Sequence, residues 1–137
     1  MNALTQIRLI WAAGMIQAGI VLVNGILPGW LRVRENVASA PRFIKQIFYV
    51  HWIYIVLTVG FFSALCCGFA RDLAGASGLG RFISAFLAGF WLLRVALQWF
   101  YYDREVRRAN CWLDALYVAS LLLLSFIFAR AAFAPVA

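Results

Sequence analysis

The sequence has few charged residues. Of its 137 residues, 12% are Asp, Glu, Lys or Arg, and 66% are hydrophobic. About a quarter of the residues in an ordinary soluble domain are charged, so this composition excludes a soluble domain. Only five residues are acidic. The apolar segments therefore lack the rings of carboxylates that line ordinary cation pathways.

Residues that carry catalytic or metal chemistry are also scarce. The single histidine, His51, excludes a b-type haem held by two histidines of one chain. It leaves open a five-coordinate haem, a His–Met pair or a haem shared across a dimer. The sequence contains no H-E-x-x-H, no phosphate loop and no nucleophile elbow. Cys66, Cys67 and Cys111 lack the C-x₂-C spacing of a zinc site, so we interpret them as small apolar fillers and expect no metal.

Long apolar runs fill most of the chain. A helix needs about 20 apolar residues to cross a hydrocarbon core roughly 30 Å thick. Four runs meet this length, at residues 7–27, 47–70, 82–101 and 112–133. The sequence therefore predicts an all-α integral membrane protein, a four-transmembrane-helix bundle with short loops. We expect residues 1–137 to form a single membrane domain with both termini on the same side.

The net charge of +7 is explained by membrane orientation and does not indicate nucleic-acid binding. Loops 28–46 and 102–111 together carry seven basic residues, whereas Arg8, Arg71, Arg81 and Arg130 lie on the opposite side. This bias predicts that the two loops are cytoplasmic and that both termini are outside. Basic loops of this kind attract anionic lipid headgroups.

Small residues predict where two of the spans pack. They let helix backbones approach closely in a membrane. Gly60, Ala64 and Gly68 are spaced by four in the second span, and Ala85 and Gly89 repeat this spacing in the third. We expect these two spans to pack tightly in the outer half of the membrane. Large aromatic residues in their inner half then predict a bundle that widens toward the cytoplasm.

An arginine lies well inside the third span. Arg94 is about 10 Å from the inner helix end, where a fixed charge is costly and marks a candidate functional site. Polar side chains expected at a similar depth are Gln98, Tyr101, His51, Tyr54, Asn24 and Asp114. Each also has a structural interpretation: hydrogen bonds between helices, an aromatic belt at the interface, or a structural Arg94–Asp114 pair.

The leading functional hypothesis is a binding or accessory protein. The polar and aromatic residues near Arg94 are expected to hold an amphiphile, such as a lipid, an isoprenoid phosphate or a quinone. The alternatives are a structural subunit of a larger membrane complex, or a small transporter or channel that forms by homo-oligomerisation. A membrane enzyme using His51 and Asp114 as a general-base pair is the least favoured alternative.

The size and four-span layout resemble those of small bacterial membrane families such as the DoxX-like proteins. No motif in the chain matches that family, so the resemblance implies no activity and no residue role. Independently of this resemblance, we expect an integral protein of a bacterial inner membrane, with membrane lipids as the first expected partners.

Overall fold

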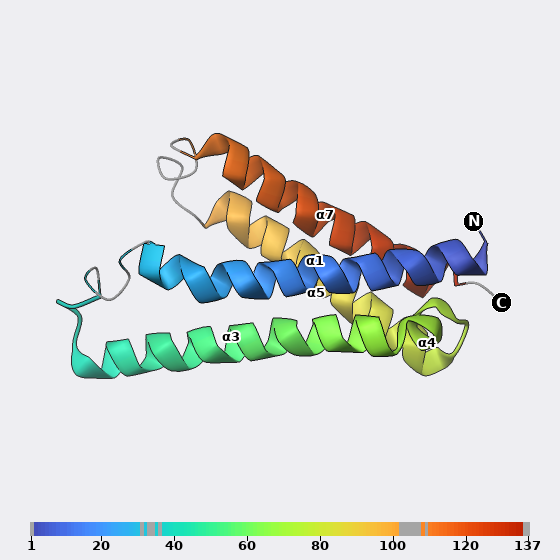
Figure 1. The fold of residues 1–137 in the computed structure, drawn as a ribbon, viewed down its shortest axis with the longest axis horizontal. Helices are drawn as coiled ribbons and strands as arrows, with labels where there is room; N and C mark the ends of the chain where they lie inside the picture. Colours follow the sequence, from blue (N-terminus) through green and yellow to red (C-terminus); the bar gives the residue numbers. More distant parts are fainter. Residues whose placement is uncertain are drawn as a thin grey trace. The chain divides into compact units, whose positions relative to one another are not determined.

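The described part of the chain is helical. The computed structural model describes residues 2–30, 32, 35, 37–101, 108 and 110–135, and within them no strand forms. Along the chain the elements are α1 (Ala3–Trp30), α3 (Arg42–Gly68), α4 (Ala70–Ala74), α5 (Gly78–Phe100) and α7 (Cys111–Phe133) (Figure 1). Four helical segments, Ala3–Ile26, Arg42–Gly68, Gly78–Phe100 and Cys111–Phe133, are long and apolar enough to cross a membrane. The predictions of an all-helical chain and of four apolar helices are confirmed, and these helices indicate an integral membrane protein.

Three of these helices begin four or five residues before the apolar runs. The runs start at residues 7, 47 and 82, whereas the helices start at Ala3, Arg42 and Gly78. Each of these extensions contains a polar or charged residue, such as Gln6, Lys45 or Arg81, so it lies outside the apolar run although it belongs to the same helix. The apolar run therefore gives the length that a membrane can cover, and the helix is longer.

The chain divides into two compact units, which are described one at a time. Residues 14–68 form the first, called here the α1–α3 hairpin. Residues 1–13 and 69–137 form the second, called here the α5–α7 unit. Helix α1 thus contributes its first turns to the α5–α7 unit and the rest of its length to the hairpin.

In the α1–α3 hairpin the two helices approach closely at Gly14. A Cβ atom built there would lie 2.7 Å from Cys67 Sγ and 3.1 Å from the carbonyl oxygen of Ser63. The hydroxyl of Ser63 donates a hydrogen bond to the Gly14 carbonyl oxygen at 2.8 Å. A Cβ at this position would force the Cys67 side chain to move and would press on the Ser63 carbonyl, so glycine suits this approach best. Gly14 therefore sets the spacing of α1 and α3.

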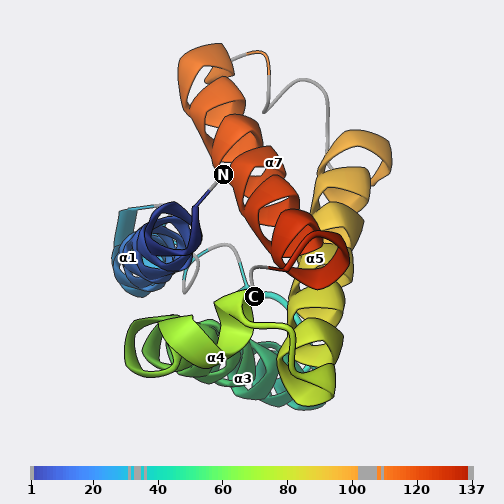
Figure 2. The same ribbon diagram turned by 90° about the vertical axis from the view of Figure 1, so that its right-hand side faces the viewer.

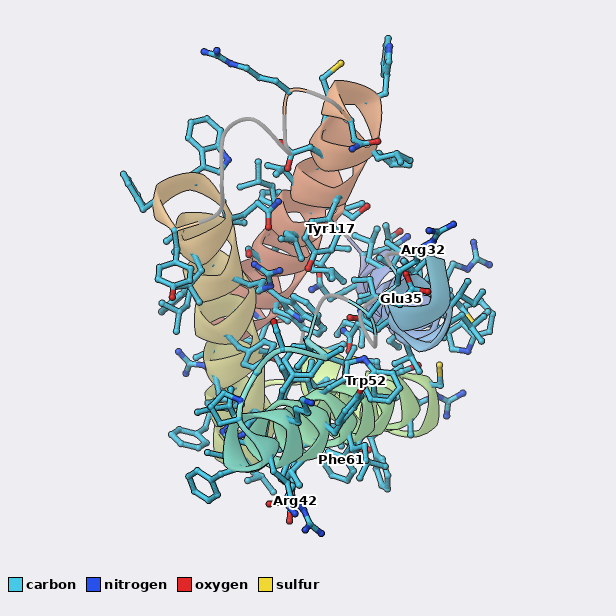
Figure 3. The ribbon with its side chains drawn as sticks, turned by 90° about the vertical axis from the view of Figure 1, so that its left-hand side faces the viewer. Arg32, Glu35, Arg42, Trp52, Phe61 and Tyr117 are labelled. Atoms are coloured by element: carbon cyan, nitrogen blue, oxygen red, sulfur yellow. The ribbon has the colours of Figure 1, made fainter. Side chains whose placement is uncertain are left out.

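A proline lies inside the last turns of α1. Pro28 has no N–H, so the Asn24 carbonyl four residues earlier loses its helical donor. The indole N–H of Trp52 donates to that carbonyl oxygen at 3.2 Å. Trp52 is on the side of α3 that faces α1 in the hairpin, and Phe61 is on the other side (Figure 3). A tertiary contact thus supplies the donor that Pro28 removes, and the helix continues to Trp30.

In the α5–α7 unit the two long helices form an antiparallel pair (Figure 2). These two helices carry large side chains with no more than 2% of their surface exposed: Leu87, Trp91, Leu121, Leu124, Ile127 and Phe128. At one end, Arg81 Nε donates to the carbonyl oxygen of Ala132 at 3.0 Å. This bond satisfies one of the carbonyls that the last turn of a helix leaves without a partner.

The short helix α4 leads directly into α5. Ser77 caps α5, because its hydroxyl oxygen accepts a hydrogen bond from the Gly80 backbone N–H at 3.1 Å. A Cβ on Gly80 would collide with the carbonyl oxygen of Asp72. Buried Ser84 then donates to the Leu73 carbonyl oxygen at 3.2 Å. These contacts fix the start of α5 against the residues before it.

The predicted small-residue contact joins residues that belong to different units. Gly60, Ala64 and Gly68 are in the α1–α3 hairpin, whereas Ala85 and Gly89 are in the α5–α7 unit. Within the described part of its own unit, a Cβ on Gly60 or on Gly68 would meet no atom closer than 4 Å. Packing between the two stripes, and the single domain expected for the whole chain, stay predictions.

Candidate functional site

A chain of polar side chains links α5 to α7 at the end opposite Arg81. Gln98 Nε2 donates to Asp114 Oδ1 at 2.7 Å. Gln98 Oε1 accepts from Arg94 Nη1 at 3.2 Å. The amide therefore presents its donor to the carboxylate and its acceptor to the guanidinium, which is the orientation that the two charges favour. Gln98 is 8% exposed, so this link is shielded within the unit.

Local sequence explains how these three side chains meet. Arg94 and Gln98 are four residues apart on α5, one above the other on the same helix face. Asp114 lies in the first turn of α7. Because α5 and α7 are antiparallel, the first turn of α7 lies beside the last turns of α5. The acid therefore reaches Gln98 from the neighbouring helix.

Tyr117 adds an aromatic contact to the same site. The guanidinium carbon of Arg94 lies 5.4 Å from the centroid of the Tyr117 ring, within the range of a cation–π interaction. Tyr117 follows Asp114 by three residues and so shares its face of α7. Both side chains are half-buried. Arg94 thus contacts side chains of its own helix and of α7.

These contacts decide whether Arg94 is tolerated in an apolar helix. An arginine at mid-bilayer costs about 2.5–3.5 kcal/mol on insertion scales. One hydrogen bond between charged and neutral groups contributes about 1.5–3 kcal/mol, and a cation–π contact contributes about 0.5–2 kcal/mol. The contacts to Gln98 and Tyr117 are therefore of the size needed to offset the insertion cost. Arg94 also lies only six residues before Phe100, the last residue of α5, about 9 Å along the axis.

Tyr101 immediately follows α5. Its backbone N–H donates to the Leu97 carbonyl oxygen, and 83% of the residue's surface is exposed. Phe100 beside it is 90% exposed, and Trp112 at the start of α7 is 86% exposed. This distribution is typical of aromatic side chains at a membrane interface. The position of Tyr101 thus agrees with the belt interpretation, and its part in ligand binding stays a prediction.

Three of the predicted site residues, His51, Tyr54 and Asn24, belong to the α1–α3 hairpin. His51 Nδ1 lies 2.9 Å from the carbonyl oxygen of Ile47, one turn earlier in the same helix. The Asn24 side-chain amide donates to the Ile20 carbonyl oxygen at 2.8 Å, also within its own helix. Tyr54 is 66% exposed. The structure brings Arg94, Gln98 and Asp114 together, and a role for these other three at the same site stays a prediction.

Two buried glutamines were not among the predicted site residues. Gln17 Nε2 lies 3.8 Å from Cys66 Sγ, a weak contact inside the hairpin. Gln6, in the α5–α7 unit, is 0% exposed, and neither heteroatom of its amide has a hydrogen-bond partner in the described part of the chain. Gln6 precedes the first apolar run by one residue, so the sequence marks it as a flanking residue. Its burial depends on neighbours that are distant in sequence.

The comparisons with known proteins give no indication of what the site does. Comparison of the chain with protein-family models, curated proteins and solved structures finds no match. In the residues that the structure describes, no three His, Cys, Asp or Glu side chains gather in an arrangement able to hold a metal ion. The function must therefore be argued from the Arg94–Gln98–Asp114 site itself.

Proposed function

We propose that this protein binds a membrane amphiphile, with the polar end of the ligand held beside Arg94. The ligand classes that fit are a phospholipid, an isoprenoid phosphate or a quinone. The observation that carries the proposal is the chain Arg94–Gln98–Asp114 between two apolar helices. A charged residue inside a spanning helix is costly and is most often kept for function.

The chemistry of Arg94 favours an anionic or carbonyl group as the polar end. A guanidinium carries five N–H donors in a fixed fork, and a phosphate or carboxylate accepts two of them in parallel. The bond to Gln98 involves Nη1, and the contact with Tyr117 is at the ring face. Exposed aromatic side chains at the same end of the unit, such as Trp99 and Phe100, offer apolar surface to the rest of the amphiphile.

The location proposed for this site is the cytoplasmic half of a bacterial inner membrane. Loops 28–46 and 102–111 carry seven basic residues against four on the other side, which favours a cytoplasmic position for both loops. Arg94, Gln98 and Asp114 lie at the end of the α5–α7 unit that adjoins loop 102–111. A ligand from the inner leaflet would therefore reach them.

The test is a comparison of retained lipids in matched arginine variants. The full chain is purified in mild detergent, and the lipids that copurify are quantified by mass spectrometry for wild type, Arg94→Ala and Arg42→Ala. Arg42 is exposed at the start of α3, so it controls for loss of one positive charge. We expect one lipid class to be enriched in wild type. We expect Arg94→Ala to reduce this enrichment about tenfold, because a hydrogen bond to a charged group contributes roughly 1.5–3 kcal/mol.

Two outcomes would contradict this proposal. If Arg94→Ala keeps the lipid profile and the stability of wild type, the site does not exist. If the profile is unchanged but the stability falls, Arg94 is a structural residue of the α5–α7 unit. Thermal unfolding of each variant in the same detergent distinguishes these two results.

The alternative of a structural subunit requires a different partner for Arg94. In that hypothesis an acid on a neighbouring chain compensates the guanidinium. Here Gln98 links Arg94 to Asp114 of the same chain, so local compensation is already available. This observation favours ligand binding, and a stoichiometric protein partner in a mild-detergent pull-down would instead support the subunit.

A further inference from the structure

The site at Arg94 contains one positive and one negative charge. Arg94 Nη1 donates to Gln98 Oε1 at 3.2 Å, and Gln98 Nε2 donates to Asp114 Oδ1 at 2.7 Å. The two bonds span a single amide group, so the guanidinium nitrogen and the carboxylate oxygen lie no more than about 8 Å apart. Arg94 and Asp114 are the half-buried charged residues described at this end of the unit, whereas Arg108 is exposed. The half-buried charges of the site therefore balance.

This balance disfavours an anionic head group. A phosphomonoester carries a charge of about −1.5 to −2 at pH 7. At Arg94 it would bind the same guanidinium that already compensates the Asp114 carboxylate. Negative charge would remain in excess beside two apolar helices, where like charges repel more strongly than they do in water. An uncharged carbonyl oxygen also accepts a hydrogen bond from a guanidinium, and it leaves the charges of the site in balance.

The side chains around the guanidinium offer apolar surface that a ligand can reach. Arg94 and Tyr117 are half-buried, so part of each side chain is accessible at the surface of the helix pair. Leu97 follows Arg94 by three residues and is 43% exposed, and Leu113 precedes Tyr117 by four residues and is 55% exposed. At these spacings each leucine is a neighbour of a site residue on the same helix face. The surface beside the guanidinium therefore suits an uncharged ring and an apolar tail.

We infer that the amphiphile held at Arg94 has an uncharged carbonyl head group, as an isoprenoid quinone does. This inference rests on the proposed function and names the ligand class of the same site. Asp114 is the residue that selects this class, because its carboxylate already compensates the positive charge that an anionic head group would require. Gln98 holds the carboxylate and the guanidinium at a fixed spacing through its two hydrogen bonds.

Two probes with the same tail test the head group. The full chain, purified in mild detergent, is titrated with a benzoquinone that carries a farnesyl tail and with farnesyl phosphate. Occupancy is measured by native mass spectrometry. We expect wild type to bind the quinone about tenfold more tightly than the phosphate, because the repulsion between two like charges about 10 Å apart has this size at the effective dielectric constant of a protein.

Three variants assign this preference to residues. Asp114→Asn keeps an oxygen that accepts from Gln98 but removes the negative charge. We expect it to tighten the binding of farnesyl phosphate about tenfold and to affect the quinone little. Asp72→Asn is the matched control, because Asp72 is exposed in α4 at the other end of the unit, and it is expected to change neither ligand. Arg94→Ala is expected to weaken the quinone about tenfold, through loss of a hydrogen bond from a charged donor.

The outcomes separate this inference from the proposed function. If farnesyl phosphate binds as tightly as the quinone and depends on Arg94, the site exists but takes an anion, and the inference is wrong. The same conclusion follows if Asp114→Asn changes the ratio of the two affinities no more than Asp72→Asn does. If Arg94→Ala changes the binding of neither probe, the proposed site itself is absent. Should Asp114→Asn fail to fold, the affinities of wild type and Arg94→Ala for the two probes still decide between these results.

Discussion

The contact between Trp52 and the carbonyl of Asn24 gives the sharpest test of the hairpin. Pro28 deprives this carbonyl of its backbone donor, and the Trp52 indole N–H replaces that donor at 3.2 Å. Trp52→Phe keeps an aromatic ring but removes the N–H. We expect it to lower the free energy of unfolding by about 1 kcal/mol through the lost hydrogen bond, within the range of about 0.6–1.7 kcal/mol for such bonds in membranes. The smaller ring will add a packing loss.

A double-mutant cycle separates the hydrogen bond from the packing loss. Pro28→Ala supplies a backbone N–H at position 28 that can donate to the Asn24 carbonyl oxygen. This carbonyl then has a donor with or without the Trp52 indole. In that background Trp52→Phe is expected to cost about 1 kcal/mol less than it does in wild type. The packing loss is the same in both backgrounds and cancels.

The assay is unfolding in mixed micelles as the mole fraction of denaturing detergent rises. Helix content is followed by circular dichroism, because tryptophan fluorescence changes with the substitution itself. A coupling energy below about 0.3 kcal/mol, the limit of ordinary additivity, would refute the claim that Trp52 compensates for Pro28.

The remaining predictions use the same assay on glycine and glutamine pairs. Gly14→Ala is expected to destabilise by about 1–3 kcal/mol, because its Cβ would lie 2.7 Å from Cys67 Sγ. Gly19→Ala, whose Cβ meets no atom within 4 Å, is expected to stabilise α1 by up to about 1 kcal/mol, and equal effects at the two positions would contradict the close approach. Gln98→Leu is expected to cost about 2–3 kcal/mol, because it breaks bonds to two charged partners. Gln17→Leu is expected to leave the free energy of unfolding unchanged or to raise it, because Gln17 Oε1 is buried without a described partner. A large loss of stability in this variant would contradict this explanation.

Much of the helical layout follows from the sequence. Apolar runs of membrane length predict the helices because a bilayer requires every backbone polar group to be paired within the segment. The spacing of Arg94 and Gln98 likewise predicts a shared helix face. Asp114 could be placed beside them because a short loop makes α5 and α7 neighbours. Each of these inferences uses local spacing or a short connection.

The sequence did not reveal the contacts that residues of α1 make with other helices. The first apolar run ends at residue 27, just before Pro28, yet α1 continues to Trp30. The donor that permits this comes from Trp52, 28 residues from Asn24. Gln6 reads as a polar flank, yet it is fully buried. Neither feature has a local signal, because both depend on which side chain of another helix reaches the position.

Hydrogen bonds at both ends of the α5–α7 pair hold its two helices in register. Lipid tails are as apolar as leucine, so apolar packing alone discriminates weakly between correct and shifted helix registers in a membrane. Arg81 with Ala132 at one end, and Gln98 with Asp114 at the other, fix that register through hydrogen bonds. Gln98 therefore both holds the helix pair together and positions Arg94. A loss of ligand in Gln98→Leu would mix these two effects, whereas Arg94→Ala leaves the Gln98–Asp114 bond between the two helices in place.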